Sequence, residues 1–279
     1  MRVKITYIAS SGHIYDLISN GIRHRKANYH TWSWEPEGTK LQYGERLAGF
    51  SKDPGRYETE LLFNGSEKKR REMIDALHDD FELDIRNLKP GRIIWGDYYL
   101  DCYMRQSTTA PDDKKAWTSN QILIYAPYPF WIQELKLALG RSEIAGAGFL
   151  DYKYDYNYDY SAPVIGSRQV KTNFPFESEF VMVIYGPAVN PRLTINDHPY
   201  VLNTAIPQNA YVEIRSKEKT IMMYENGGRE TNMFDFRNKT DSVFARIPGG
   251  NLLITWDATF GVDLTIFRER SEPRIEVVT

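Results

Sequence analysis

Cysteine and surplus charge are both scarce in this sequence, and each absence removes a class of protein. A single cysteine, Cys102, excludes an intrachain disulfide framework and a zinc cluster built on cysteine thiolates. The 35 lysine and arginine residues nearly balance the 37 aspartate and glutamate residues, which leaves a net charge of −2. Binding to nucleic acid or to an anionic membrane relies on many neutralised charges, so the composition excludes a general affinity of that kind. These properties fit folding in a reducing cytoplasm.

Long hydrophobic runs are missing as well. No apolar run approaches the ~18 residues that a helix needs to span a bilayer. The segment 1–18 alternates apolar and polar residues without an unbroken apolar core, so we interpret it as a strand and not as a signal peptide. We therefore expect no membrane partner and no export by the usual route.

The motifs that carry catalysis or bind cofactors are also missing. The sequence has no G-x-S-x-G elbow and no glycine-rich loop that joins a strand to a helix and could cradle phosphates. A glycosidase carboxylate pair is defined by its spatial separation of about 5 to 9.5 Å, so the sequence leaves that site open. We predict no catalytic, cofactor-binding or metal-binding residues, and a hydrolase is the least supported class. The histidines lack a metal-ligand spacing; they are His13, His24, His30, His78 and His198.

Most of the sequence carries the two-residue period of half-buried strands. In "YETELLF" (57–63), the side chains of Tyr57, Thr59, Leu61 and Phe63 share one face. "KPGRIIWGDYYLDCYM" contains two β-rich runs around Gly96, which predicts a hairpin. We therefore expect a mainly β protein.

One segment has a helical period instead. After the turn "NGS", the apolar residues Met73, Ile74, Leu77 and Phe81 recur at steps of three and four. Ser66 stands where a side chain can cap the first turn. The pattern predicts one amphipathic helix of roughly 15 residues.

Small and flexible residues, "GRSEIAGAG", mark the best domain boundary. From about Phe174, seven or more short strands with turns between them indicate an antiparallel sandwich or jelly roll. We predict an N-terminal β domain with one helix at 1–140, a linker with a tyrosine strip at 141–162, and a C-terminal β-sandwich at 163–279.

The tyrosine strip "DYKYDYNYDY" (151–160) places tyrosine at every second position. Aromatic faces and carboxylates would suit a sugar platform, and the spaced aspartates would suit calcium, although the EF-hand pattern of ligands is absent. Strict alternation also produces a strand that buries its tyrosine face, which favours a structural seam between the two domains. The seam hypothesis rests on Tyr154, Tyr156 and Tyr158.

Charge on the predicted helix runs against the helix dipole, which favours acids at the start and bases at the end. The bases occupy 68–71, and the acids are Asp75, Asp79, Asp80 and Glu82. A solvated face with pairs such as Arg71 with Asp75 would explain this order. The alternative is an interface in a head-to-tail ring of copies. Its candidate residues are Lys68, Arg71, Asp75 and Asp79.

Several stretches occur in an order that is familiar from one family. They are "TWSWEPEG", "GERLAGFSKDPGRYETELLFNGS", "ALHDDFELD", "KPGRIIWGDYYLDCYM", "GPAVNPRLTIN" and "IPGGNLLITW". Together they are spread over most of the 279 residues, from position 31 to position 256. The chain resembles the distal tail protein (Dit) family of bacteriophages with long, non-contractile tails, especially those that infect Gram-positive hosts.

This resemblance implies a hexameric ring at the virion tail tip, assembled in the cytoplasm of the bacterial host. The N-terminal β domain would form the ring, and a C-terminal galectin-like sandwich would lie outside it. The ring would join the tail tube protein to the tail-associated hub or lysin protein and would support baseplate or receptor-binding proteins. DNA would pass through its centre without being specifically recognised, and neither enzyme activity nor a cofactor is implied.

The galectin-like half departs from the sugar-binding pattern of galectins. Asn190, Pro191 and Arg192 match the His-x-Asn-Pro-Arg strand, but Ala188 occupies the histidine position. Trp256 is followed by "DATFG", which lacks the glutamate and arginine of the second galectin strand. Pro191 and Asn190 also mark a turn into a strand. The alternative function is a carbohydrate-binding module or adhesin that recognises host cell-wall polysaccharide through exposed aromatic residues.

Overall fold

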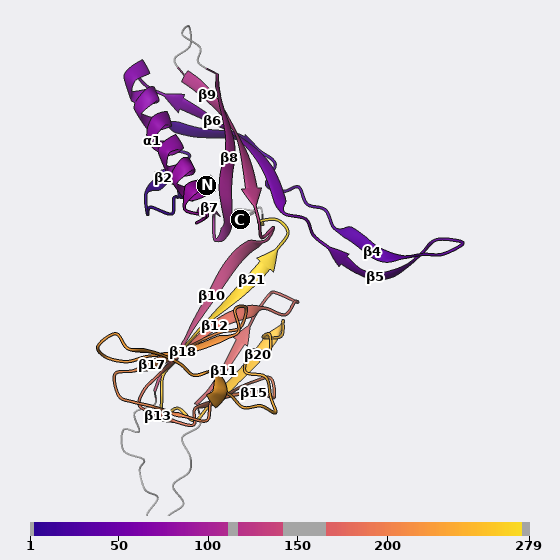
Figure 1. Cartoon of the computed structure of the whole chain (residues 1–279), viewed down its shortest axis with the longest axis vertical. Coiled ribbons are helices and arrows are strands. Elements are labelled where there is room, and N and C mark those ends of the chain that lie inside the picture. Colours follow the sequence, from indigo (N-terminus) through magenta and orange to yellow (C-terminus); the bar gives the residue numbers. More distant parts are fainter. Residues whose placement is uncertain (1–2, 111–116, 142–165, 275–279) are drawn as a thin grey trace, which may run out of the picture. The chain divides into compact units, whose positions relative to one another are not determined.

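The computed structural model describes residues 3–110, 117–141 and 166–274 of the chain. These residues form β-strands and a single α-helix, so the prediction of a mainly β fold with one helix is confirmed (Figure 1). Contacts divide the chain into two compact units, and each unit has its own apolar core. Unit 1 contains Met1–Gln133 and Glu269–Thr279, and unit 2 contains Glu134–Arg268. None of the described helices has the length and apolar character needed to cross a membrane.

Two strands contain residues of both units. They are β10 (Trp131–Leu139) and β21 (Val262–Arg270). The chain leaves unit 1 after Gln133, inside β10, and returns to it at Glu269, inside β21. The residues from Glu269 onward are therefore grouped with the N-terminal half of the sequence.

The sequence analysis divides the chain differently, with domains at 1–140 and 163–279 and a linker at 141–162. Residues 142–165, which contain most of that linker, lie outside the described residues. The seam hypothesis therefore stays a prediction. The tyrosines that it names, Tyr154, Tyr156 and Tyr158, all lie in this range.

Unit 1 is built on two sheets that share one long strand, β8 (Tyr98–Ala110). The first sheet has the order β2 (Ile14–Asp16), β1 (Ile5–Ile8), β7 (Gly91–Trp95), β8. The second has the order β3 (Ile22–Ala27), β6 (Gly55–Asn64), β9 (Trp117–Ala126), β8. The register of β8 shifts between Met104 and Gln106, and such a bulge bends a strand and increases its twist. The predicted hairpin at Gly96 is confirmed, since Trp95 pairs with Tyr98.

The helix α1 (Glu67–Arg86) packs on β8 and β6. Its 20 residues exceed the predicted length, but the predicted cap is confirmed: the Ser66 side chain accepts a hydrogen bond from the Lys69 N–H at 3.4 Å. Ile74, Leu77 and Phe81 are buried in the core of unit 1. The period of three and four therefore identified the face that packs on the sheets.

Unit 2 contains two antiparallel sheets that share one core. One sheet contains β12 (Glu179–Tyr185), β17 (Tyr211–Arg215), β18 (Thr220–Tyr224) and β19 (Glu230–Asn232), with β21 beside β12. The other contains β11 (Gly166–Lys171), β20 (Asn251–Trp256), β14 (Arg192–Ile195) and β15 (His198–Val201). A short pair, β13 (Ala188–Val189) with β16 (Ala205–Ile206), and a 3-10 turn at Phe234–Phe236 complete the unit. Phe180, Val212 and Leu264 of the first sheet join Leu193 and Ile254 of the second in the core, which is the packing of a β-sandwich.

Two acids of α1 point into unit 1, and the sequence analysis placed one of them, Asp80, among the exposed charges of the helix end. Asp80 is only 5% exposed. It accepts hydrogen bonds from the Ser11 hydroxyl at 2.8 Å and from the Tyr15 hydroxyl, and it lies 2.9 Å from Nδ1 of His13. Asp80 therefore ties the helix to the turn between β1 and β2.

Asp84 lies one helical turn further along and is fully buried. It accepts hydrogen bonds from the Tyr7 hydroxyl and from the Ser10 N–H, the latter at 2.9 Å. A Cβ on Gly91 would stand 2.3 Å from the Tyr7 hydroxyl and 2.5 Å from an Asp84 oxygen, so this place requires glycine. Since a buried carboxylate is costly unless its oxygens are hydrogen-bonded, the two acids fix the N-terminal turn in one position.

We expect Asp80→Asn to destabilise the chain in a pH-dependent way. Burial raises the pKa of Asp80, but hydrogen bonds from Tyr15, Ser11 and His13 outweigh it and hold that pKa below its ordinary value of 3.8. A depressed pKa contributes stability above the unfolded pKa, and this contribution is lost as the pH falls through the folded pKa. The loss on substitution should be about 1–3 kcal/mol at pH 6 and should shrink below about pH 4.

The measurement is denaturant unfolding between pH 3 and pH 6, with Asp79→Asn as the matched control. Asp79 is the next residue on α1 and is exposed. An Asp80 variant whose free energy of unfolding follows that of the Asp79 control at every pH would contradict the assignment.

Candidate assembly surface

Between Thr31 and Ser51 the chain forms a two-stranded hairpin that belongs to neither sheet of unit 1 (Figure 1). In it, β4 (Glu35–Lys40) pairs antiparallel with β5 (Glu45–Ser51). Every residue from Thr31 to Ser51 is exposed except Gly49, which is half-buried. An isolated two-stranded hairpin is at best marginally stable in water, because it has no layer in which to bury apolar side chains.

The two faces of this hairpin differ in chemistry. Pro36 is paired with Phe50 and Gly38 with Leu47, and directly opposite residues of an antiparallel pair share a face. The opposite face carries polar residues, namely Glu35, Glu37, Thr39, Arg46 and Ser51. The charged pair Lys40 and Glu45 ends the apolar face next to the turn. The hairpin is therefore amphipathic, and its apolar face lies open to solvent with Leu47 54% and Phe50 57% exposed.

Large apolar side chains extend from the hairpin's root to its tip. The set with substantial exposure is Trp32, Trp34, Leu41, Tyr43, Leu47 and Phe50. Contiguous exposed apolar patches mark interaction sites, and aromatic residues are enriched in protein interfaces. We therefore take the β4–β5 hairpin as the candidate assembly surface.

The sequence analysis used "TWSWEPEG" and "GERLAGF" only as family cues and did not identify this surface. Alternation along a strand has the same period whether or not a second layer covers the apolar face. A signal was present in Trp32 and Trp34, two large aromatic residues at alternate positions next to Pro36, because proline is confined to edges and bulges of sheets.

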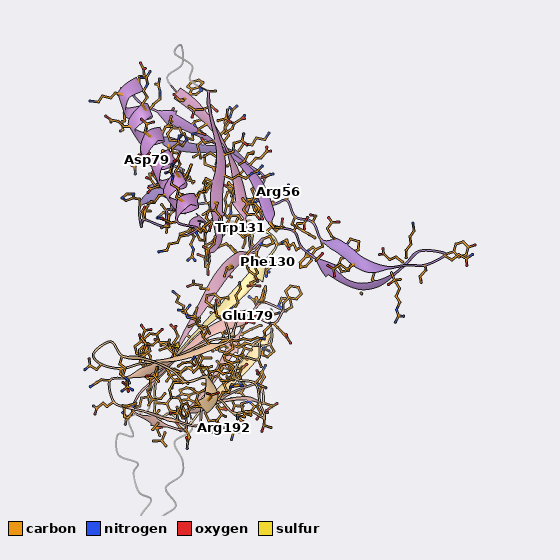
Figure 2. All side chains as sticks on the ribbon, viewed as in Figure 1. Arg56, Asp79, Phe130, Trp131, Glu179 and Arg192 are labelled. Atoms are coloured by element: carbon orange, nitrogen blue, oxygen red, sulfur yellow. The ribbon has the colours of Figure 1, made fainter. Side chains whose placement is uncertain are left out.

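The interface predicted on the helix occupies a solvent-exposed stripe of α1, with Asp79 labelled in Figure 2. The four predicted residues, Lys68, Arg71, Asp75 and Asp79, are all exposed. Lys68 lies 3.9 Å from Glu72, and Arg71 pairs with Glu67 instead of Asp75. Exposed pairs of this kind contribute little to stability, so both bases stay available to a partner.

The two parts of the partial lectin motif lie on opposite faces of their sheet. Leu193 of β14 is paired with Trp256 of β20, and both pack against the core of unit 2. Arg192, the neighbour of Leu193 on β14, is exposed, and by strand alternation it lies on the other face. Asn190 has a φ of 48° in the turn between β13 and β14, as the alternative interpretation of a turn into a strand predicts. Arg192 and Trp256 therefore cannot contact the same sugar.

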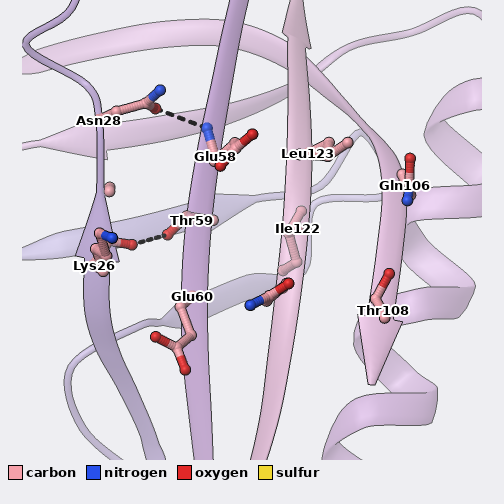
Figure 3. Close-up of a pocket in the computed structure, with 11 residues that line it drawn as sticks. Lys26, Asn28, Glu58, Thr59, Glu60, Gln106, Thr108, Ile122 and Leu123 are labelled. Carbon is pink, nitrogen blue, oxygen red and sulfur yellow. Dashed lines mark hydrogen bonds between the residues drawn. The ribbon is translucent and has the colours of Figure 1, made fainter. Parts of the chain in front are cut away.

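A shallow groove crosses the outer face of the sheet β3–β6–β9–β8 (Figure 3). Asn28 Oδ1 accepts a hydrogen bond from the Glu58 N–H at 2.7 Å, and the Thr59 hydroxyl donates to the Lys26 carbonyl at 3.2 Å. The Glu60 carboxylate in this groove is already engaged by Arg25 and Ser119. Glu58 lines the same groove, and both its backbone N–H and the Glu60 carboxylate are engaged in contacts between strands.

No cluster of three or more histidine, cysteine or acidic side chains with metal-binding geometry occurs in the described part of the chain. Cys102 is buried in the core of unit 1, and burial raises the pKa of its thiol far above the ordinary value. A protonated, enclosed thiol is a poor nucleophile and a poor metal ligand.

Comparison with known proteins finds no matching family model and no matching curated protein. Solved structures do match. The Dit protein of phage SPP1, described as a paradigm of the hub adsorption apparatus in phages that infect Gram-positive bacteria, superposes with a TM-score of 0.62 at 10% identity. The match covers 95% of this chain and 99% of the SPP1 protein.

Chains from the phage P2 baseplate, in its activated conformation with calcium or strontium, match with TM-scores of 0.60 and 0.59 at 14% identity. Each match covers 98% of this chain and 100% of the P2 chain. The chain therefore has the fold of phage distal tail and baseplate proteins, as the sequence resemblance predicts.

We expect Gly38→Ala to disrupt the hairpin and Gly49→Ala to leave it intact. A Cβ on Gly38 would stand 2.5 Å from the Arg46 carbonyl oxygen across the strands, whereas a Cβ on Gly49 would meet no atom within 4 Å. Amide hydrogen exchange over 35–51 reports the difference, because the cross-strand hydrogen bonds protect these amides. Equal exchange in the two variants would contradict the hairpin geometry, and the rest of unit 1 should exchange as in the natural chain in both.

Proposed function

We propose that this chain is a structural protein of a bacteriophage tail tip, in which copies form a ring that serves as the platform of the baseplate. The fold alone does not carry this proposal, because folds host many functions. The observation that carries it is the β4–β5 hairpin, whose apolar side chains Pro36, Leu47 and Phe50 lie exposed on one face. A second copy of the chain is the partner that we infer for it.

We infer that a different surface of the next copy receives the hairpin's apolar face. Such a contact is head to tail and not two-fold symmetric. Head-to-tail contacts close into rings or continue as open filaments. The Dit resemblance favours a closed ring of six copies, and near neutrality of the chain suits a central channel through which DNA must slide without being held.

The remaining partners follow from the same resemblance and stay proposals. The ring would join the tail tube protein to the tail-associated hub or lysin protein at the virion tail tip. Baseplate or receptor-binding proteins would attach to unit 2, the galectin-like part of the proposal. No catalytic role is proposed, because the Glu60 carboxylate of the groove is engaged by Arg25 and Ser119 and the lone thiol is buried.

The exposed stripe of α1 is a second candidate contact within the ring. Lys68 and Arg71 lie near the start of the helix, and Asp75 and Asp79 lie further along it on exposed positions. Complementary charges steer association and fix the register of an interface more than they raise affinity. We propose that this stripe orients neighbouring copies while the hairpin supplies the buried apolar area.

A carbohydrate-binding adhesin is the alternative, and one feature of unit 2 bears on it. Tyr185, Tyr211 and Tyr224 form a row across β12, β17 and β18. Sugars stack on open ring faces, yet Tyr211 and Tyr224 stack on each other with centroids 5.0 Å apart. The Tyr185 hydroxyl donates to Asp263 at 2.8 Å, so part of the row is engaged within the chain, which counts against a sugar platform.

We expect the purified chain to form particles of six copies, and six copies of 32.5 kDa give about 195 kDa. The double variant Leu47→Ser, Phe50→Ser should be monomeric, because it removes the large apolar side chains that a neighbouring copy would cover. Both residues are exposed in the single chain, so its thermal unfolding should stay unchanged. Light scattering gives the mass, and negative-stain images show whether particles are rings.

The matched control is Val189→Ser with Leu253→Ser, which removes two apolar side chains that are 74% and 45% exposed on unit 2. This control should retain the mass of the natural chain. A natural chain that stays single at all concentrations, or a hairpin variant that assembles fully, would overturn the role proposed for the hairpin.

The charge reversal Lys68→Glu, Arg71→Glu should weaken assembly by a smaller amount and more strongly at low salt, because exposed charges are screened by ions. The control Lys219→Glu, Lys239→Glu makes the same change in net charge on exposed positions of unit 2. Light scattering at low salt and at 0.5 M salt measures the assembly of both variants. Equal assembly of the helix variant and its control would contradict an interface on α1.

A further inference from the structure

At the base of the β4–β5 hairpin, a small group of residues surrounds the Lys52 side chain. The Lys52 ammonium donates a hydrogen bond to the Pro129 carbonyl oxygen at 2.7 Å. Its Nζ lies 4.4 Å from the centre of the Phe130 ring and 5.5 Å from that of Trp34. These two rings also contact each other, with centroids 6.0 Å apart. We call this group, Lys52 with Trp34, Pro129 and Phe130, the Lys52 cage.

The cage joins both ends of the hairpin to one place. Trp34 directly precedes β4, and Lys52 directly follows β5. Phe130 directly precedes β10 and is labelled beside Trp131 in Figure 2. The two side chains that flank the hairpin therefore converge on a segment of unit 1 that is distant in sequence.

That segment is itself firmly held. Trp131 is fully buried and packs edge to face against Tyr29 and Tyr57 with centroids 5.5 and 6.4 Å away. Tyr128 packs against Phe130 with centroids 5.1 Å apart, and its hydroxyl donates to Glu269 at 2.6 Å. The cage thus fastens an otherwise uncovered hairpin to the rigid part of unit 1.

A half-buried ammonium at this position loses hydration, which costs free energy. An apolar side chain of similar size would fill the same space without that cost. Burial lowers the pKa of Lys52 to about 8, which records that cost. The carbonyl and the two ring faces offset part of the lost hydration, because a cation is attracted to the negative face of an aromatic ring. Unlike apolar contact, these interactions have direction, so they can fix an angle as well as a distance.

We propose that Lys52 is a positioning residue that holds the root of the β4–β5 hairpin in one direction, so that each copy presents its hairpin ready for the next. The benefit for assembly rests on the proposed function. A hairpin that swings freely loses its freedom when it binds, and this entropy opposes association. If the root of the hairpin is already fixed, most of this conformational entropy is lost before binding. The entropy cost of association is then smaller for each copy in the ring.

The charge on Lys52 can be removed by pH. Around its Nζ stand two rings and a carbonyl; Asp53, the next residue, is exposed, and Glu269 accepts the hydrogen bond of Tyr128. The attraction to the rings needs the protonated amine. It is therefore present below the folded pKa of about 8 and is lost as the pH rises through that value.

The first test measures hairpin mobility in single chains, in the Leu47→Ser, Phe50→Ser background. Spin labels on Gln42→Cys at the hairpin tip and Glu58→Cys on β6 report a distance distribution, and both positions are exposed. Cys102 is fully buried, so only the two introduced thiols react. Should that background still assemble, the natural hairpin is measured in the particle with labelled copies diluted among unlabelled ones.

Two variants, compared with the natural lysine, separate the directional role of Lys52 from simple packing. Lys52→Met keeps the stem and loses the charge, and it should broaden the distribution at pH 7. Lys52→Arg keeps charge and donor, and it should preserve the narrow distribution. At pH 9.5 the distance distribution of the chain with the natural lysine should broaden. That of the arginine variant should stay narrow, because arginine remains charged. Equal widths for lysine, methionine and arginine would overturn the proposal, whatever the oligomeric state.

A second readout tests the benefit for assembly in the natural hairpin. Lys52→Met should weaken association about tenfold, with Lys52→Arg close to the natural chain, and the melting temperature of the single chain should not change. If the chain never assembles, the proposed function fails, while the distance distributions still decide the role of Lys52. If association is unchanged but the distribution broadens, the root is fixed without benefit to the ring, and that part of the proposal is wrong.

Discussion

A two-stranded hairpin cannot bury its own apolar face, and this constraint governs how the chain can function. The strands of the two units lie in larger sheets or pack on an apolar core, and α1 covers the sheets of unit 1. The β4–β5 hairpin has neither kind of cover. Under the proposed function, a neighbouring copy of the chain covers this apolar side.

The rest of unit 1 is organised as a firm base for that hairpin. Asp80 and Asp84 join α1 to the turn between β1 and β2 through hydrogen bonds. Around Tyr29, an aromatic cluster packs Trp95 and Trp131 edge to face. Aromatic edge-to-face contacts fix relative angles, and buried hydrogen-bonded carboxylates fix positions. A rigid base is what allows an exposed element to hold a direction.

The sequence predicts this fold where local periodicity and local chemistry agree. The apolar steps through Ile74 and Leu77, with Ser66 before them, locate α1 because a helix repeats every 3.6 residues. The same rule could have identified the buried acids, since Asp80 and Asp84 lie three and seven residues after Leu77 on its stripe. The negative charge of Asp80 instead suggests an exposed position on the helix. The open hairpin could not be found this way, because alternation does not reveal whether a second layer exists.

An exposed amphipathic hairpin also carries a hazard, because its strands have free edges that could pair with any other chain. The structure limits this in two ways. Charged residues stand along both strands, and an extra residue in β5 shifts the register between Glu37 and Gly38, which twists the edge away from flat pairing. Association through the edges is thereby discouraged while the apolar face stays open. The hairpin thus favours a partner that covers a face, which suits an ordered head-to-tail contact and opposes indefinite strand addition.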